Sequence, residues 1–240
     1  KSIQNLKKRN IFKEVKYTKT SNDDNKQVID ITVEEKPTGE IFAGAGTGTS
    51  GTNLSAGIKE NNYLGLGIKL DTDVTITEDS IKGKFTVINP NINNSDKSLK
   101  TAFENSTTDN LSTSGYKTSR TGISIGTEFE QYKDLYVNLE QSNFYENLET
   151  SDNANSIVKK QEGDYFENLL SYNISFNKLN NNFKPTDGFI TNFSQTLPIY
   201  SEDWSFENSF STSKYMSLND NLTLSARFLL KTINSLDDDV

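Results

Sequence analysis

Residues 28–49 read VIDITVEEKPTGEIFAGAGTGT and join two strand patterns through a break. In the first pattern Ile29, Ile31 and Val33 alternate with polar residues, which is the period of two of a half-buried strand. The Pro-Thr-Gly sequence that follows interrupts this strand, because proline cannot donate to a strand ladder and glycine weakens it. The stretch therefore predicts a strand, a joint and a second strand.

The second strand of this stretch, residues 40–49, carries glycines on one face. Gly44, Gly46 and Gly48 occupy alternate positions, where a strand usually prefers larger residues. We expect such a strand to pair weakly and to leave its edge available. The GAGTG sequence also suggests a phosphate-binding loop, but a dinucleotide fingerprint requires a following helix, and this sequence continues as strand and turn.

Strand patterns follow one another along the rest of the chain. Apolar residues recur at alternate positions in residues 68–76, 81–87, 123–129, 135–139, 166–176, 189–193, 206–210 and 222–230. We expect about eleven strands, many of about ten or more residues. Strands of globular proteins average about five or six residues, whereas a tilted membrane strand needs about 9 to 11. The predicted fold class is mainly β, an antiparallel transmembrane β-barrel. A soluble β-sandwich is the structural alternative, because it alternates in the same way.

The beginning of the chain predicts a different unit. Residues 2–10 place Ile3 and Leu6 on one helical face, residues 12–20 alternate as a strand, and residues 28–35 form the next strand. A unit of this size is too small to bury a stable core by itself.

Composition argues against several classes of protein. Only 32% of the 240 residues are hydrophobic, which is low for a soluble core but suits a barrel with a polar interior. No segment approaches the roughly 20 apolar residues of a membrane helix. Histidine and cysteine are absent, which removes the Ser-His-Asp triad and thiolate metal sites, so we do not expect an enzyme. The net charge of -8 argues against nucleic-acid binding.

Charged clusters have ordinary explanations. The three adjacent aspartates of residues 237–239 fit a solvated loop better than a cation site, because their side chains would alternate on a strand. Lys69, Asp71, Asp73 and Lys84 are expected to solvate the polar interior of a barrel. Four aromatic side chains near strand ends are expected to anchor the barrel at the membrane interface, namely Tyr63, Tyr132, Tyr136 and Trp204.

Four stretches of the chain together resemble a known family. They are ITVEEKPTG at residues 31–39, ENNYLGLG at residues 60–67, the Asn-Pro pair at residues 89–90, and KPTDGF at residues 184–189. This set resembles the BamA family of outer-membrane protein assembly factors, in which a last POTRA module ends in a segment like ITVEEKPTG and the first barrel strand follows. Leu66 departs from the pattern, since many members carry a basic or small residue between the two glycines.

The resemblance implies two domains. Residues 1–37 would be the C-terminal part of the last POTRA domain, in the periplasm, and residues 38–240 the N-terminal part of a barrel in the bacterial outer membrane. A family barrel of about sixteen strands implies that about five more follow residue 240 and that this chain is an internal piece. The implied joint consists of Glu35, Lys36, Pro37, Thr38 and Gly39. The implied strand-opening turn consists of Pro185, Thr186, Asp187 and Gly188.

The resemblance also implies a function. The first and last barrel strands of the family form a weak seam, and an incoming outer-membrane protein adds its own strand to the opened edge by β-augmentation. The implied edge consists of Glu40, Ile41, Phe42, Ala43, Gly44, Ala45, Gly46, Thr47, Gly48 and Thr49. Implied partners are unfolded outer-membrane β-barrel proteins, periplasmic assembly lipoproteins and the lipid bilayer. No cofactor, nucleotide or metal is implied, since client folding supplies the energy. A two-partner secretion barrel, an autotransporter-assembly barrel and a passive porin remain alternatives.

Overall fold

The described part of the chain consists almost entirely of β-strands. The computed structural model describes residues 11–21, 27–48, 51–181, 184–202, 204–219 and 222–236. β1 (Phe12–Ser21) and β2 (Gln27–Glu35) pair as an antiparallel ribbon, and the remaining strands form one large sheet. The predicted helix at residues 2–10 and the aspartates of residues 237–239 lie outside the described residues.

The large sheet is an antiparallel meander of eleven strands in which each strand pairs with its neighbours in the chain. The strands, of 10 to 17 residues, are β3 (Gly39–Gly48), β4 (Gly51–Tyr63), β5 (Ile68–Thr77), β6 (Ser80–Asn89), β7 (Lys97–Asn110), β8 (Tyr116–Tyr132), β9 (Leu135–Thr150), β10 (Gly163–Asn177), β11 (Gly188–Tyr200), β12 (Ser205–Asn219) and β13 (Leu222–Ser235). Two short helical turns, η1 (Ile92–Asn94) and α2 (Ser156–Lys159), lie in the connections. The predicted number and direction of the strands are confirmed.

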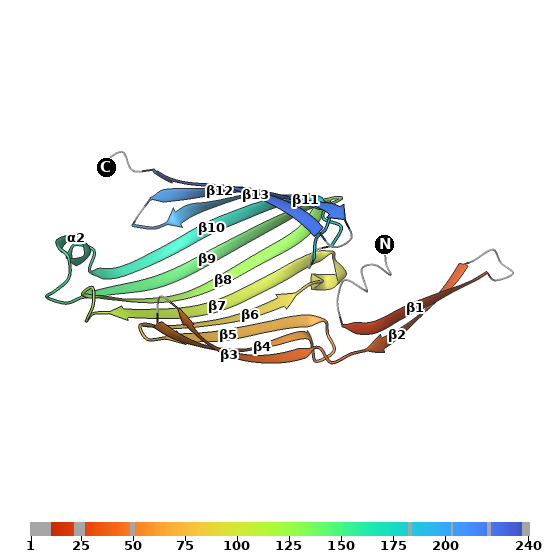
Figure 1. The fold of residues 1–240 in the computed structure, drawn as a ribbon, viewed down its shortest axis with the longest axis horizontal. Helices are drawn as coiled ribbons and strands as arrows, with labels where there is room; N and C mark the ends of the chain where they lie inside the picture. The colour runs from red at the N-terminus through yellow and green to blue at the C-terminus, as the bar shows by residue number, and fades with distance from the viewer. Residues whose placement is uncertain are drawn as a thin grey trace.

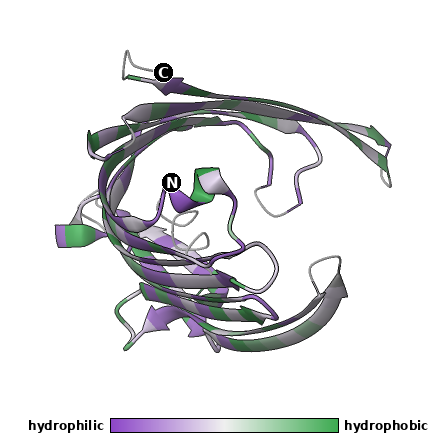
Figure 2. Ribbon diagram, turned by 90° about the vertical axis from the view of Figure 1, so that its left-hand side faces the viewer, coloured by the Kyte–Doolittle hydropathy of each residue, from purple (hydrophilic) through white to green (hydrophobic). Residues whose placement is uncertain are grey.

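The large sheet is strongly curved. Seen from one end (Figure 2), it forms an open arc whose two edges are β3 and β13. The β1–β2 ribbon extends from the end of the sheet where β3 begins, and α2 lies at the opposite end (Figure 1). We call these the hairpin end and the α2 end.

Ion pairs that cross an intervening strand identify the concave face. Lys100 on β7 pairs with Glu140 on β9 at 2.6 Å, and Arg120 on β8 pairs with Glu167 on β10 at 2.9 Å. Side chains converge on the inner side of a curved sheet, so these residues and the positions in register with them face inward. Strand register places Lys69, Asp71, Asp73 and Lys84 on this face, as predicted for a polar interior.

Convex positions carry large apolar side chains. Phe103 and Ile123 lie opposite each other on β7 and β8 and are 50% and 53% exposed. Ile174, Phe193 and Phe210 form a similar row across β10, β11 and β12. Polar inward and apolar outward positions therefore alternate along the strands, as in a barrel that faces lipid.

The described residues form no second layer against this sheet that would make it a sandwich (Figure 2). Among the described residues, Ile11 and Ala102 are the buried hydrophobic residues, whereas a sandwich buries the facing sides of two packed sheets. The described residues contain no helix long and apolar enough to cross a bilayer. The part-barrel prediction is confirmed, and the sandwich alternative is wrong.

One of the four predicted aromatic anchors is wrong. Tyr136 is in register with Ser175 and Glu130, so its side chain belongs to the concave face. Tyr63 and Tyr132 take outward positions at the hairpin end and are 44% and 69% exposed. Alternation around a short turn sets the direction of each side chain, and closeness to a strand end does not.

β11 opens at the predicted turn. The side chain of Asn180 holds the turn, because its Oδ1 accepts from the backbone N–H groups of Thr186 and Asp187, each at 3.1 Å. Gly188 then begins β11 with a φ of +100°, and an added Cβ would clash with the carbonyl oxygen of Lys178. Both the backbone conformation and the close approach require glycine here.

Replacing Gly188 by alanine is expected to lower the free energy of unfolding by about 1–3 kcal/mol, because alanine is strained at this φ and meets the Lys178 carbonyl. Urea titration of the full-length protein in detergent micelles measures the loss. Gly83→Ala is the matched control, since the nearest atom to its added Cβ is Val74 Cγ2 at 4.0 Å. Equal stability of the two variants contradicts the role assigned to Gly188.

Candidate functional site

β3 forms one edge of the large sheet. Ten residue pairs join it to β4, from Gly39 opposite Glu60 to Gly48 opposite Gly51, and within the described residues it pairs with no other strand. All predicted edge residues except Thr49 belong to β3, and Thr49 lies outside the described residues. The opposite edge of the sheet is β13.

The first half of β3 is packed on its concave face. Phe42 lies opposite Gly57, and its ring occupies the space that a Cβ on Gly57 would need. Lys59 Nζ lies 5.6 Å from the centre of the same ring and 3.8 Å from Asp71 Oδ2. On the convex face Ile41 is 84% exposed, which is compatible with contact to lipid.

The second half of β3 carries small side chains. Gly44 and Gly46 face inward, where an added Cβ would lie 3.3 Å from Ser55 Oγ and 2.9 Å from Asn53 Oδ1. Ala43 and Ala45 face outward and help to line a shallow apolar depression. Cross-strand side-chain pairs stabilise a sheet, so this half is held to β4 mainly by backbone hydrogen bonds.

The predicted joint connects the two sheets and contacts both of them. Lys36, Pro37 and Thr38 form no regular structure between β2 and β3. The Lys36 N–H donates to the carbonyl oxygen of Ile11 at 3.3 Å, just before β1. The Thr38 carbonyl accepts from both the backbone N–H and the side-chain Nδ2 of Asn61, each at 3.2 Å. The start of β3 is therefore fixed to β4 at the hairpin end.

A charge cluster that the sequence patterns did not reveal lies on the concave face. Arg120 donates to Glu146 at 3.3 Å and to Glu167 at 2.9 Å, which joins β8, β9 and β10. Its guanidinium also lies 4.0 Å from the centre of the Phe144 ring. That ring covers Gly122, where a Cβ would clash with it. The sequence contained one signal for this cluster. Gly122 follows Arg120 by two positions, so both residues lie on the same face of a strand.

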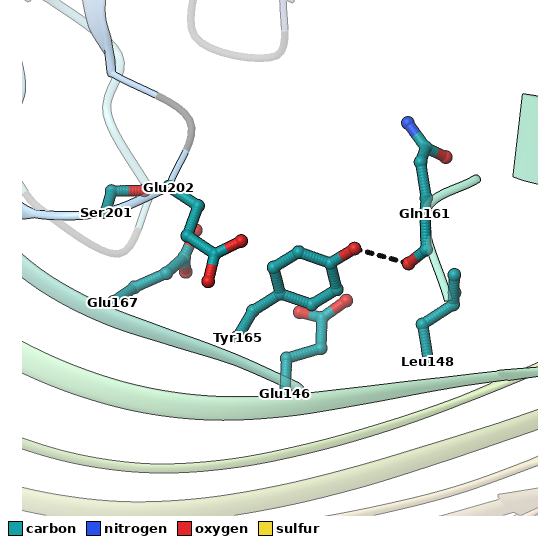
Figure 3. Close-up of a pocket in the computed structure, with 7 residues that line it drawn as sticks. All are labelled: Glu146, Leu148, Gln161, Tyr165, Glu167, Ser201 and Glu202. Atoms are coloured by element: carbon teal, nitrogen blue, oxygen red, sulfur yellow. Dashed lines mark hydrogen bonds between the residues drawn. The ribbon is translucent and has the colours of Figure 1, made fainter. Parts of the chain in front are cut away.

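A pocket of about 260 Å³ adjoins this cluster (Figure 3). Carboxylates of Glu146, Glu167 and Glu202 surround Tyr165, whose hydroxyl donates to the backbone oxygen of Gln161. Acidic side chains predominate among the charged residues that line this pocket. Among the described residues no group of three or more histidine, cysteine or carboxylate side chains is placed to hold a metal ion.

Comparison with protein families identifies the sheet. The model of the Omp85 superfamily domain matches residues 62–239, which extend from the end of β4 through β13. The chain belongs to the Omp85 superfamily. This is a family of outer-membrane β-barrels, so the apolar convex face is the one that contacts lipid.

A solved structure shares the fold of this Omp85 chain. It is a crystal structure of BamA from Haemophilus ducreyi that lacks POTRA domains 1–3, with 21% sequence identity and a TM-score of 0.73. The match covers 98% of this chain and 49% of the BamA chain. The Omp85 chain therefore spans about half the length of this relative.

Replacing Arg120 by methionine is expected to lower the free energy of unfolding by about 1–2 kcal/mol, because two half-buried carboxylates and the Phe144 ring lose their cation. Lys84→Met is the matched control, since Lys84 pairs with one more exposed carboxylate, Glu104 at 3.0 Å, and is expected to cost less than about 1 kcal/mol. Urea unfolding in lipid vesicles compares them, and equal losses would refute the cluster's contribution.

Proposed function

We propose that this chain is part of an outer-membrane protein assembly factor that folds and inserts β-barrel proteins through the edge of β3. One observation carries the proposal. Within the described residues β3 pairs on one side only, and the half beyond Phe42 has small side chains on both faces. The proposed client-pairing edge comprises residues 40–49, with Thr49 included on the sequence alone.

The physical basis is the cost of unpaired backbone in lipid. A buried N–H or C=O group without a partner is strongly unfavourable in hydrocarbon. An unfolded barrel protein arrives with the same unsatisfied groups. Pairing between its strand and β3 satisfies both backbones with little demand on sequence, which suits a protein that accepts many clients.

The proposed arrangement places the hairpin end in the periplasm and residues 1–37 at the end of a POTRA domain. The β1–β2 ribbon directly precedes β3 and supports this placement. Periplasmic assembly lipoproteins are the proposed partners of that domain.

The proposed activity is not enzymatic and uses no cofactor, because client folding into the bilayer releases the free energy. The ion-paired interior then serves stability and solvation. Arg120 contacts two carboxylates and one aromatic ring, so we assign it a structural role in the interior.

Depletion of the full-length protein in its own cells tests the function. The proposal expects a general loss of folded outer-membrane β-barrel proteins, measured by heat-modifiable electrophoretic mobility. Loss of one secreted partner alone identifies a dedicated transporter, and no loss identifies a passive barrel. Either of the last two results contradicts the proposal.

Replacing Gly44 and Gly46 by valine is expected to slow client insertion, because β-branched side chains strengthen the pairing of β3 with β4. Serine and asparagine side chains are the neighbours that must move, and both are flexible, so the barrel is expected to fold. The measurement is the rate of client folding in proteoliposomes that contain the full-length protein.

The matched control for this experiment is Gly83→Val on β6, an interior strand. An added Cβ there meets nothing closer than Val74 Cγ2 at 4.0 Å, and the site lies away from the β3 edge. The control is expected to insert clients at the normal rate. A normal rate in the Gly44 and Gly46 variant removes the proposed role of the small residues.

A further inference from the structure

Outward-facing charges of β7–β12 differ between the two ends of the sheet. At the hairpin end the outward-facing charges within the strands are Lys97 and Lys214, and Lys178 directly follows β10. Lys97 lies opposite Phe129, the Lys178 N–H donates to the carbonyl of Phe189, and Phe189 lies opposite Lys214. The partners of these lysines belong to the convex apolar rows, so the lysines also face outward.

The α2 end is mainly acidic on its outward side. Asp109 and Glu149 flank Lys117 by register, and Asp164 accepts from Tyr145 and Asn147 at 2.8 and 2.9 Å. Over β7–β12 the two ends of the lipid-facing surface therefore carry opposite net charge. On the concave face, by contrast, lysines and carboxylates form ion pairs across strands, such as Lys84 with Glu104 and Lys100 with Glu140.

Two of the three lysines at the hairpin end lie against aromatic rings. Lys97 Nζ is 5.4 Å from the centre of the Phe129 ring, and Lys178 Nζ is 5.2 Å from the centre of the Phe176 ring. Phe176 contacts Phe189 edge-on, with ring centres 5.7 Å apart. A lysine whose ammonium group lies over an aromatic ring at the border of an apolar surface is suited to a membrane interface.

These three lysines are exposed, and within the described residues none of them pairs with a carboxylate. The nearby strand carboxylates, Glu128 and Glu130, take inward positions by register. The turns at this end contribute Asp96, Asp134 and Asp187, which lie beyond the strands, together with Lys133 and Lys184. Within the described residues these outward positions therefore present positive charge that no ion pair neutralises.

We propose that Lys97, Lys178 and Lys214 bind the headgroups of anionic phospholipids in the leaflet at the hairpin end. Charge complementarity selects this occupant, because the ammonium groups lie at the boundary of an apolar lipid-facing band, where phosphates are located. The outward positions at the same end of β3–β6 contain no lysine among the described residues. The proposed lipid-binding surface is therefore on β7–β12, away from the β3 edge.

Lipid binding at this surface does not require client insertion. An experiment can therefore disprove the lipid-binding proposal without testing the proposed function. A fluorophore on Thr191→Cys, which faces outward between Phe176 and Thr212, reports the local lipid composition. A fluorophore on Thr121→Cys reports the outward surface nearer the α2 end. The full-length protein, with any other cysteine replaced, is reconstituted in phosphatidylcholine vesicles that contain a minority of phosphatidylglycerol, with one of the two lipids brominated as a quencher.

Quenching at Thr191→Cys by brominated phosphatidylglycerol is expected to indicate local enrichment of up to about fivefold per lysine at low salt, decreasing at high salt. The double variant Lys178→Gln with Lys214→Gln should reduce this quenching to the level given by brominated phosphatidylcholine. Lys117→Gln, an outward lysine at the α2 end, should leave it unchanged. Each single variant is also measured, so a poorly folding double variant does not decide the result.

Two results overturn the inference. The first is equal quenching by both lipids at Thr191→Cys in the protein with all its lysines. The second is undiminished enrichment in the lysine variants, singly or together. Enrichment of the same size at Thr121→Cys also contradicts it, because the lysines at the hairpin end would then have no special part.

Discussion

Backbone pairing in lipid is the constraint on which this structure depends. Water is absent from the hydrocarbon region, so every N–H and C=O group that crosses it needs a partner within the protein. The strands from β4 to β12 meet this need on both sides. Side-chain choice then follows from the curvature of the sheet, with apolar residues outward and ion-paired residues inward. A chain that is 32% hydrophobic can satisfy this arrangement because it does not need a conventional core.

The same constraint explains why β3 matters. An edge strand is costly in a membrane, and proteins usually close or cover such edges. Here one half of β3 is fixed, through Phe42 over Gly57 and through the Thr38 carbonyl to Asn61. The other half has glycine inward and alanine outward, so it rests on backbone bonds. A strand anchored at one end and weakly packed at the other suits repeated opening at a defined place.

Much of this fold was predictable from the sequence, and the omissions have physical reasons. A strand is easy to predict when its outward positions hold large apolar residues. The outward positions of β4 and β7 include alanine, threonine and asparagine, so their alternation is weak. The break between β2 and β3 was predictable, because proline and glycine act locally, whereas the turn that opens β11 was implied by the family resemblance. The cluster around Arg120 was not, since it joins residues on three strands whose register no local pattern specifies.

Disulfide trapping shows directly whether a client strand pairs with β3. Cysteines are placed one at a time at Ile41, Ala43 and Thr47 on β3, and at Thr101 on the interior strand β7, in the full-length protein with an arrested client that carries a cysteine in its terminal strand. If clients pair with β3, cross-links form from β3, each to client positions that shift in register along the strand, and none forms from Thr101. Cross-links that are absent from β3, or equally frequent at Thr101, would contradict it.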